Sequence, residues 1–306
     1  MRNYLLWLTV FLLLGILLSC GEPTTSTVHF SVTGIEKVSE VKLATVLLVK
    51  TDNGVVAKFG NTATPAGVLW GDDENVIVGP SPIVWVRGDD VKVLQLPESS
   101  PDVVFGVVPW VLKRNLYVYV PRPAEEGLYG AVYKYDGRRW QKLYTFSSPC
   151  DFLHATVYDG VVYFYGGRCG VLRLDDGKLA DIGNLSYSAG VVFNGDMMFI
   201  LAELASPTVY SYDLRSGDIS QVRVFKNTHD ISWIGVCGFS YKGRLPIFLL
   251  EKYEGEKYYL YAYDAIGDKL FDIGQIDDDV GWYNCLPTSS EVYLIGDKIY
   301  RIGFGK

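Results

Sequence analysis

The sequence contains few of the residues that common catalytic sites need. Only three of its 306 residues are histidine, namely His29, His154 and His229. It has no G-x-S-x-G turn, no H-E-x-x-H, no P-loop and no G-x-G-x-x-G between a strand and a helix. These absences argue against the common hydrolases. They leave open catalysis by scattered Asp and Glu residues, because the spacing of such carboxylates along the chain carries no signature.

Positive charge is also sparse. Lys and Arg together number 28 against 35 Asp and Glu, which gives a net charge of −7. The largest basic clusters are the pairs Lys113-Arg114 and Arg138-Arg139. A nucleic-acid binder needs a surface that neutralises phosphates, so we expect no nucleic-acid partner.

A sustained period of 3.6 residues is absent beyond the N-terminal segment, so we expect essentially no helix there. Short runs of Val, Tyr, Phe, Leu and Ile alternate with turns instead, and the chain holds 22 Tyr, 14 Phe, 7 Trp and 32 Gly. Aromatic strands separated by glycine turns are typical of an all-β protein. The dipeptides Asp159-Gly160, Asn194-Gly195 and Lys242-Gly243 lie between hydrophobic residues and predict β-hairpins.

The N-terminus predicts a cleaved leader helix. Met1 and Arg2 give a positive start, and the apolar block from Tyr4 to Leu18 is uncharged. At about 15 residues this block is shorter than the roughly 20 that a membrane span needs, and it matches the hydrophobic region of a secretory signal. We therefore predict a signal peptide over residues 1–19.

The leader ends in Leu17, Leu18, Ser19 and Cys20, which resembles the lipobox of bacterial lipoproteins. The resemblance implies cleavage before Cys20, acylation of its thiol and a short tether over 20–27. Acyl chains on Cys20 would hold the protein stably on a lipid bilayer. Gly21 is not the Asp that commonly retains such proteins in the inner membrane of Gram-negative cells. We thus expect an extracytoplasmic lipoprotein on the outer membrane or cell surface; a plain secretory signal and an uncleaved anchor are the alternatives.

A repeat runs through the rest of the chain. The segments "ATVYDGVVYFYGG" (155–167), "GVVFNGDMMFILA" (190–202) and "GFSYKGRLPIFLL" (238–250) share one pattern, and looser copies place further turns at residues 40, 74, 115 and 290. The spacings of about 35 to 48 residues are typical of a β-propeller built from four-stranded blades. We predict a propeller over 28–306 with six or seven blades, seven favoured. A strand near 28–32 would complete the last blade, and a two-domain β-sandwich is the alternative.

Two details resemble known propeller families. Gly166-Gly167 after "VYFY" is similar to the double glycine of kelch repeats, and "VYSYDLRSG" (209–217) resembles the blade turn of quinoproteins. The resemblance implies the fold alone. A quinone cofactor would want adjacent cysteines, which the sequence lacks, so we expect no cofactor.

Four cysteines remain beyond Cys20, in a compartment that permits disulfides. Three pairings are possible. We predict a bond between Cys150 and Cys169, because the repeat places both in loops on one propeller face. Cys237 and Cys285 would then pair, since they lie on equivalent strands of neighbouring blades. No C-x-x-C is present, so structural zinc is not expected.

Acidic loops at "WGDDEN" (70–75) and "IDDDVGWYN" (276–284) offer oxygen ligands of the kind that Ca²⁺ prefers. Solvated acidic loops are the interpretation that we favour, and we predict no metal site.

Aromatic and acidic residues recur near the start of each predicted innermost strand, where a propeller opens onto its central channel. Flat rings beside carboxylates suit a sugar. Packing between blades is the alternative role of the rings, and it is the commoner one for large aromatic residues. The predicted ligand-binding residues are Trp110, Asp151, Tyr187, His229, Asp230, Trp233, Asp279, Trp282 and Tyr283.

Together these features favour a membrane-anchored propeller that binds or scaffolds a glycan, a peptide or an envelope protein. We expect a monomer and assign no catalytic residue. The alternative is a secreted carbohydrate-active enzyme, a glycoside hydrolase or lyase, that uses Asp and Glu on the propeller face. Two or more carboxylates converging in one pocket would favour the enzyme.

Overall fold

The computed structural model describes most of the chain beyond the leader. The described residues are 30–43, 46–51, 54–59, 62–65, 68–71, 74–79, 82–97, 107–125, 128–146, 154–167, 170–175, 178–182, 185, 187–203, 206–280, 284–288 and 290–305. The predicted leader helix, Cys20 and the tether lie outside these ranges. Within them the secondary structure is entirely β, and no helix is long and apolar enough to cross a membrane.

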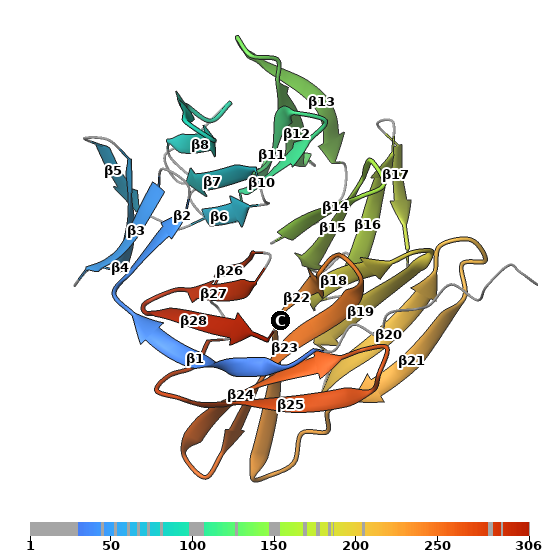
Figure 1. Cartoon of the computed structure of the whole chain (residues 1–306). Helices are drawn as coiled ribbons and strands as arrows, with labels where there is room; N and C mark the ends of the chain where they lie inside the picture. Colours follow the sequence, from blue (N-terminus) through green and yellow to red (C-terminus); the bar gives the residue numbers. More distant parts are fainter. Residues whose placement is uncertain are drawn as a thin grey trace, which may run out of the picture.

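The strands form seven four-stranded antiparallel sheets, which stand around a common axis as the blades of a propeller (Figure 1). The prediction of seven blades is confirmed, and the two-sandwich alternative is wrong. Each of the first six blades is one continuous stretch of chain, and in blades 2 to 6 the first strand is the innermost.

Blades 1 to 3 cover the first half of the chain. Blade 1 consists of β2 (Glu40–Leu43), β3 (Val46–Thr51), β4 (Gly54–Phe59) and β5 (Thr62–Pro65). Blade 2 consists of β6 (Val68–Gly71), β7 (Asn75–Gly79), β8 (Ile83–Arg87) and β9 (Asp90–Leu94). Blade 3 consists of β10 (Val108–Leu112), β11 (Asn115–Glu125), β12 (Leu128–Tyr135) and β13 (Trp140–Phe146).

Blades 4 to 6 follow in the same manner. Blade 4 consists of β14 (His154–Tyr158), β15 (Val161–Gly167), β16 (Gly170–Asp175) and β17 (Lys178–Asp181). Blade 5 consists of β18 (Ser188–Asn194), β19 (Met197–Glu203), β20 (Pro207–Asp213) and β21 (Ile219–Val224). Blade 6 consists of β22 (Ile231–Tyr241), β23 (Leu245–Glu254), β24 (Lys257–Asp264) and β25 (Lys269–Ile276).

Blade 7 joins the two ends of the described chain. Its inner strands are β26 (Asn284–Pro287), β27 (Glu291–Ile295) and β28 (Ile299–Phe304), and its outer strand is β1 (Val32–Val38). β1 pairs antiparallel with β28, from Val38 opposite Ile299 to Val32 opposite Phe304. The ring is thus closed by an N-terminal strand, as expected, although that strand lies at Val32–Val38 rather than near 28–32.

Hairpin turns follow the dipeptides closely. Asp159 and Gly160 have φ of 47° and 75°, and Lys242 and Gly243 have φ of 51° and 66°. Positive φ at both turn positions defines the type I′ turn, whose twist matches that of the paired strands. In blade 5 the two-residue loop comes one residue later than predicted, because β18 ends at Asn194 and β19 begins at Met197.

The turn between the third and fourth strands carries a recurring aspartate. Asp136, Asp213 and Asp264 each accept hydrogen bonds at one carboxylate oxygen from the backbone N–H groups two and three residues later. This Asx turn replaces two backbone partners that the sheet cannot supply there. The same hydrogen bonds hold the pKa of Asp136 and of Asp213 below the usual range.

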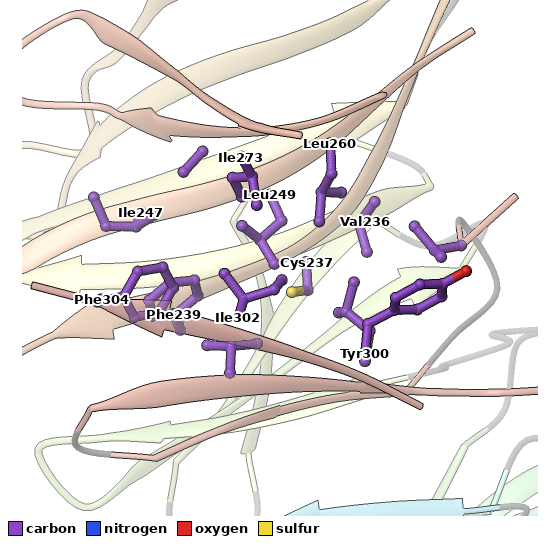
Figure 2. Close-up of a cluster of buried hydrophobic side chains, with 14 of the residues drawn as sticks. Val236, Cys237, Phe239, Ile247, Leu249, Leu260, Ile273, Tyr300, Ile302 and Phe304 are labelled. Atoms are coloured by element: carbon purple, nitrogen blue, oxygen red, sulfur yellow. The ribbon is translucent and has the colours of Figure 1, made fainter. Parts of the chain in front are cut away.

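The core is a series of apolar clusters between neighbouring blades. Along β23, Ile247 and Leu249 pack toward blade 7, whereas Phe248 and Leu250 pack toward blade 5. Successive side chains of a strand point to opposite faces, so a strand that is buried on both faces reads as a continuous apolar run. Figure 2 shows the cluster between blades 6 and 7, where Cys237 lies among Leu249, Ile302 and their neighbours.

Blade 1 has an unusual position. The inner strand of blade 7, β26, contacts β6 of blade 2 directly. Blade 1 packs against both neighbours through one shared cluster, which includes Leu48, Val84 and Ile299. In Figure 1 blade 1 stands outside the line from β26 to β6. The repeat predicts a hairpin turn at Glu40, but Glu40 is the first residue of β2.

Candidate binding face on blade 6

The innermost strands all begin on one side of the ring, because every blade contributes four antiparallel strands between one crossover and the next. We call this side the crossover face. It carries the blade-to-blade crossovers and the turns between second and third strands. Of the predicted ligand-binding residues, Tyr187, His229, Asp230 and Asp279 lie in or beside such crossovers. Asp151, Trp282 and Tyr283 lie outside the described residues, and so do Cys150 and Cys169.

Trp110 does not reach the crossover face. Its side chain is 1% exposed. The ring stacks on Tyr117 with centroids 5.6 Å apart and meets the edge of Phe164 at 5.1 Å. Trp110 therefore packs between blades 3 and 4, which is the alternative role that the sequence left open for these rings.

Tyr187, by contrast, is open to solvent at the start of β18, with 52% of its surface exposed. Its φ of 57° is left-handed, a conformation that bulky residues rarely adopt. The backbone N–H of Tyr187 donates to the carbonyl oxygen of Gly167 at 2.9 Å, which fixes the residue against blade 4.

His229 and Asp230 project from the crossover between blades 5 and 6. Their side chains are almost fully exposed, and Nδ1 of His229 lies 3.3 Å from Oδ1 of Asp230. Asn227 anchors this crossover at both ends. Its N–H donates to Oγ of Ser206 at 3.0 Å, and its Oδ1 accepts from the N–H of Trp233 at 2.6 Å.

Trp233 is half-buried on the side of blade 6 that faces blade 5. Its ring lies 5.4 Å from that of Phe225 and 5.2 Å from that of Tyr261. Nζ of Lys252 stands 5.7 Å from the centre of the indole ring and also pairs with Glu254 at 2.5 Å. The hydrogen bond that Lys252 donates to the carboxylate of Glu254 raises the pKa of Lys252. Trp233 thus packs against two aromatic rings and a cation and stays half-exposed.

Blades 5, 6 and 7 have predicted binding residues on the crossover face, and blade 6 has the longest first and second strands of the three. β22 spans 11 residues and β23 spans 10, against 7 for β18 and 4 for β26. The hairpin from Lys252 to Tyr261 and the start of β22 form what we call the blade 6 wall. On its side toward blade 7, the rings of Tyr253 and Tyr258 lie 5.0 Å apart, and Tyr253 is 38% exposed.

Trp233 is the one wall residue that the sequence predicted, although "EKYEGEKYYLYAYD" (251–264) also contains a signal for the hairpin residues. Alternation along this strand places Glu251 on the same side as Ile247 and Leu249, which is an unusual position for an acid. The tyrosines beyond it would also have indicated a hairpin with aromatic residues on both faces.

Glu251 is the one fully buried carboxyl group among the buried polar residues of the described chain. Its Oε2 accepts a hydrogen bond from the N–H of Val280 at 2.5 Å, in the crossover between blades 6 and 7. Burial raises the pKa of Glu251 to about 7, and the carboxyl groups of Asp279 and Asp278 act in the same direction. We call Glu251, Asp278 and Asp279 the carboxyl cluster.

A lysine partly balances the carboxyl cluster. Nζ of Lys298, in the turn between β27 and β28, lies 3.0 Å from Oδ2 of Asp278. Tyr258 lies beside the carboxyl cluster, and its pKa is raised by burial and, to a smaller degree, by the charges of Asp279 and Glu251. The described residues contain no group of three or more His, Cys, Asp or Glu side chains that could hold a metal ion.

The predicted bond between Cys237 and Cys285 is present, with Cα atoms 6.3 Å apart. It connects β22 to β26, the innermost strands of blades 6 and 7. Cys237 is a buried member of the apolar cluster in Figure 2, and Cys285 packs against that cluster.

Comparison with known proteins supports the fold alone. No protein-family model matches the chain, and no curated protein sequence matches it. An oligogalacturonate lyase in complex with manganese has a similar structure, with a TM-score of 0.55 and 11% identity over 91% of this chain and 96% of its own. The oligogalacturonate lyase of Vibrio parahaemolyticus has a TM-score of 0.52 and 10% identity over 87% of this chain and 86% of its own. The computationally designed protein Ika8 has a TM-score of 0.50 and 9% identity, over 89% and 98% of the two chains.

Proposed function

We propose that this chain is an extracytoplasmic propeller, anchored to a membrane through acylated Cys20, that binds a glycan on its crossover face. The observation that carries the proposal is the blade 6 wall. There a rigid hairpin presents half-buried and exposed rings, Trp233, Tyr253 and Tyr261 among them, beside carboxylates. Such rings offer apolar faces to the C–H groups of a sugar, and the acids accept hydrogen bonds from its hydroxyl groups.

Charge near the wall favours a neutral sugar. Lys252 pairs with Glu254, Lys298 pairs with Asp278, and Lys37 pairs with Asp277 at 2.8 Å. Each of these cations already faces a carboxylate, and the whole chain has a net charge of −7. A polyanion such as oligogalacturonate would meet like charge here. The likeness to the two lyases is therefore carried over as a fold and not as a substrate.

A carbohydrate-active enzyme is the second candidate, and the carboxyl cluster is the observation that favours it. A carboxyl group with a pKa of about 7 has the property that a general acid needs. However, Glu251 is fully buried. A general acid must reach the bond that it protonates, so binding is the function that this geometry supports better.

A glycan array probed with the purified protein tests the proposal. We expect neutral glycans to be retained, and Trp233→Ala and Tyr253→Ala each to weaken binding by about tenfold or more. Trp140→Ala is the matched control, because Trp140 is also half-buried but begins β13 on the opposite face. Retention of acidic glycans alone, or equal losses in Trp140→Ala and Trp233→Ala, would contradict the proposal.

A further inference from the structure

Glu251 closes an otherwise apolar row. It follows Ile247 and Leu249 on the side of β23 that packs against blade 7, opposite Ile234 of β22 and Leu260 of β24. Val280, which is also fully buried, covers this end of the row and donates its N–H to Oε2. The other carboxyl oxygen, Oε1, is buried and accepts no hydrogen bond from the described residues.

The groups that face Glu251 come from three elements. Asp278 and Asp279 approach from the crossover and Tyr258 from β24, and Tyr253 at the end of β23 packs against Tyr258. Lys298, from the turn before β28, is paired with Asp278. Asp277, one residue further back, pairs with Lys37 of the closing strand. Glu251 and Asp279 are thus two carboxyl groups within hydrogen-bonding reach, and no described cation pairs directly with Glu251.

One proton provides a hydrogen bond for Oε1 of Glu251 and removes the repulsion between Glu251 and Asp279. With the proton on Oε1, Glu251 donates a hydrogen bond to the carboxylate of Asp279 while Oε2 accepts from Val280. Without that proton, Oε1 becomes part of a buried anion that faces a second carboxylate, which is costly in a poorly solvated site. The arrangement is complete only in the protonated state.

We propose that Glu251 and Asp279 share a proton that fastens residues 277–280 to blade 6, and that loss of this proton loosens the crossover. The inference rests on the proposed function in one respect: residues 277–280 border the blade 6 wall on the crossover face, so the proposed ligand site there is pH-controlled.

The direction of the control follows from the pKa of Glu251, which is raised from 4.5 to about 7 in the folded protein. Between pH 4.5 and about 7, Glu251 keeps its proton in the fastened state, whereas a solvated Glu251 in an open state has released it. The fastening is therefore complete below pH 4.5, declines as the pH rises, and has gone above about pH 7.

Hydrogen exchange of the full chain tests the fastening without any ligand. In the wild type we expect the protection of residues 277–280, corrected for intrinsic exchange rates, to fall by about tenfold or more between about pH 5 and about pH 8. Glu251→Gln should stay protected at both pH values, because its amide accepts from Val280 and donates to Asp279. Glu254→Gln is the matched control and should behave as the wild type, since Glu254 lies three positions along the same strand, on its other face, and pairs with Lys252.

Equal protection of the wild type at both pH values would overturn the proposal, and so would the wild-type decline in Glu251→Gln. Where Glu251→Gln fails to fold, Asp279→Asn provides the second test, because it removes the opposing charge and should flatten the pH dependence. A glycan that binds with the same affinity at about pH 5 and about pH 8 would contradict the claim that the ligand site is pH-controlled. An absence of any glycan ligand would instead count against the proposed function, while the exchange result would stand.

Discussion

Cys237 and Cys285 connect neighbouring blades at the centre of the ring: their Cα atoms are 6.3 Å apart, and 48 residues separate them in sequence. The bond joins blade 6 to blade 7, which is the blade that β1 completes. It constrains the unfolded chain through a long loop, and it links two innermost strands in the folded state.

We predict that Cys237→Ser with Cys285→Ser lowers the free energy of unfolding by about 3 to 4 kcal/mol. Urea titration with and without a reductant measures the effect. In the double variant, a reductant can no longer lower the free energy of unfolding through this bond. Any loss that the reductant still causes is then the contribution of Cys150 and Cys169. Equal stability of the variant and the oxidised wild type would contradict the prediction.

Gly190 and Gly238 allow two innermost strands to approach backbone to backbone. A Cβ atom on Gly190 would lie 2.5 Å from the backbone nitrogen of Gly238. Because that contact involves backbone atoms, a side-chain rotation cannot relieve it. We predict that Gly190→Ala lowers the free energy of unfolding by about 1 to 3 kcal/mol.

Gly243→Asn is the matched control for Gly190→Ala. A Cβ atom on Gly243 meets nothing within 4 Å, and its φ of 66° is one that Asn tolerates. Thermal unfolding of both variants decides the matter. A larger loss in the control would show that the close approach of β18 and β22 has no energetic role.

Local signals explain how much of the fold the sequence could predict. The hairpin at Asp159-Gly160 and the Asx turn at Asp213 each depend on a few neighbouring residues, so the repeat could be read directly. Blade 1 lacks such a dipeptide between β2 and β3, and its turn was therefore misplaced at Glu40. The pairing of Cys237 with Cys285 followed from the repeat register, because equivalent strands of adjacent blades are neighbours in space.

The candidate site was less predictable for a different reason. Trp110 and Trp233 occupy similar positions in the repeat, yet one packs between blades and the other reaches solvent. Burial of a ring depends on what the next blade places against it, which the periodicity of one strand does not contain. Glu251 and Asp279 are likewise brought together only by the packing of the crossover against β23.

Cys20 lies outside the described residues, and its acylation stays a prediction from the lipobox. Cys20→Ala should move the protein from the membrane to the soluble fraction, because a chain without acyl groups loses its anchor. Fractionation of cells and mass spectrometry of the N-terminal peptide measure the two consequences. Ser19→Ala is the control, since a small residue is retained before the cleavage point. Membrane association of Cys20→Ala at the wild-type level would show that Cys20 is not the anchor.

The half-buried His154 and the buried Glu251 oppose each other in the pH dependence of stability. Burial lowers the pKa of His154 from 6.5 to about 4, with its ring stacked 5.2 Å from that of Tyr165. The unfolded chain takes up this proton first, so His154 destabilises the fold as the pH falls from 6.5 toward 4. Glu251, whose pKa is raised from 4.5 to about 7, destabilises the fold as the pH rises through that range.

Since the two windows overlap between 4.5 and 6.5, we predict that removing either group exposes the slope of the other. His154→Phe, which keeps a ring against Tyr165, should lose stability as the pH rises from about 4.5 to about 6.5. Glu251→Gln should lose stability as the pH falls across the same range, and the wild type should vary less than either. Urea unfolding at several pH values in this window gives the three slopes. Slopes of the same sign in both variants would mean that one of these groups does not titrate as its burial requires.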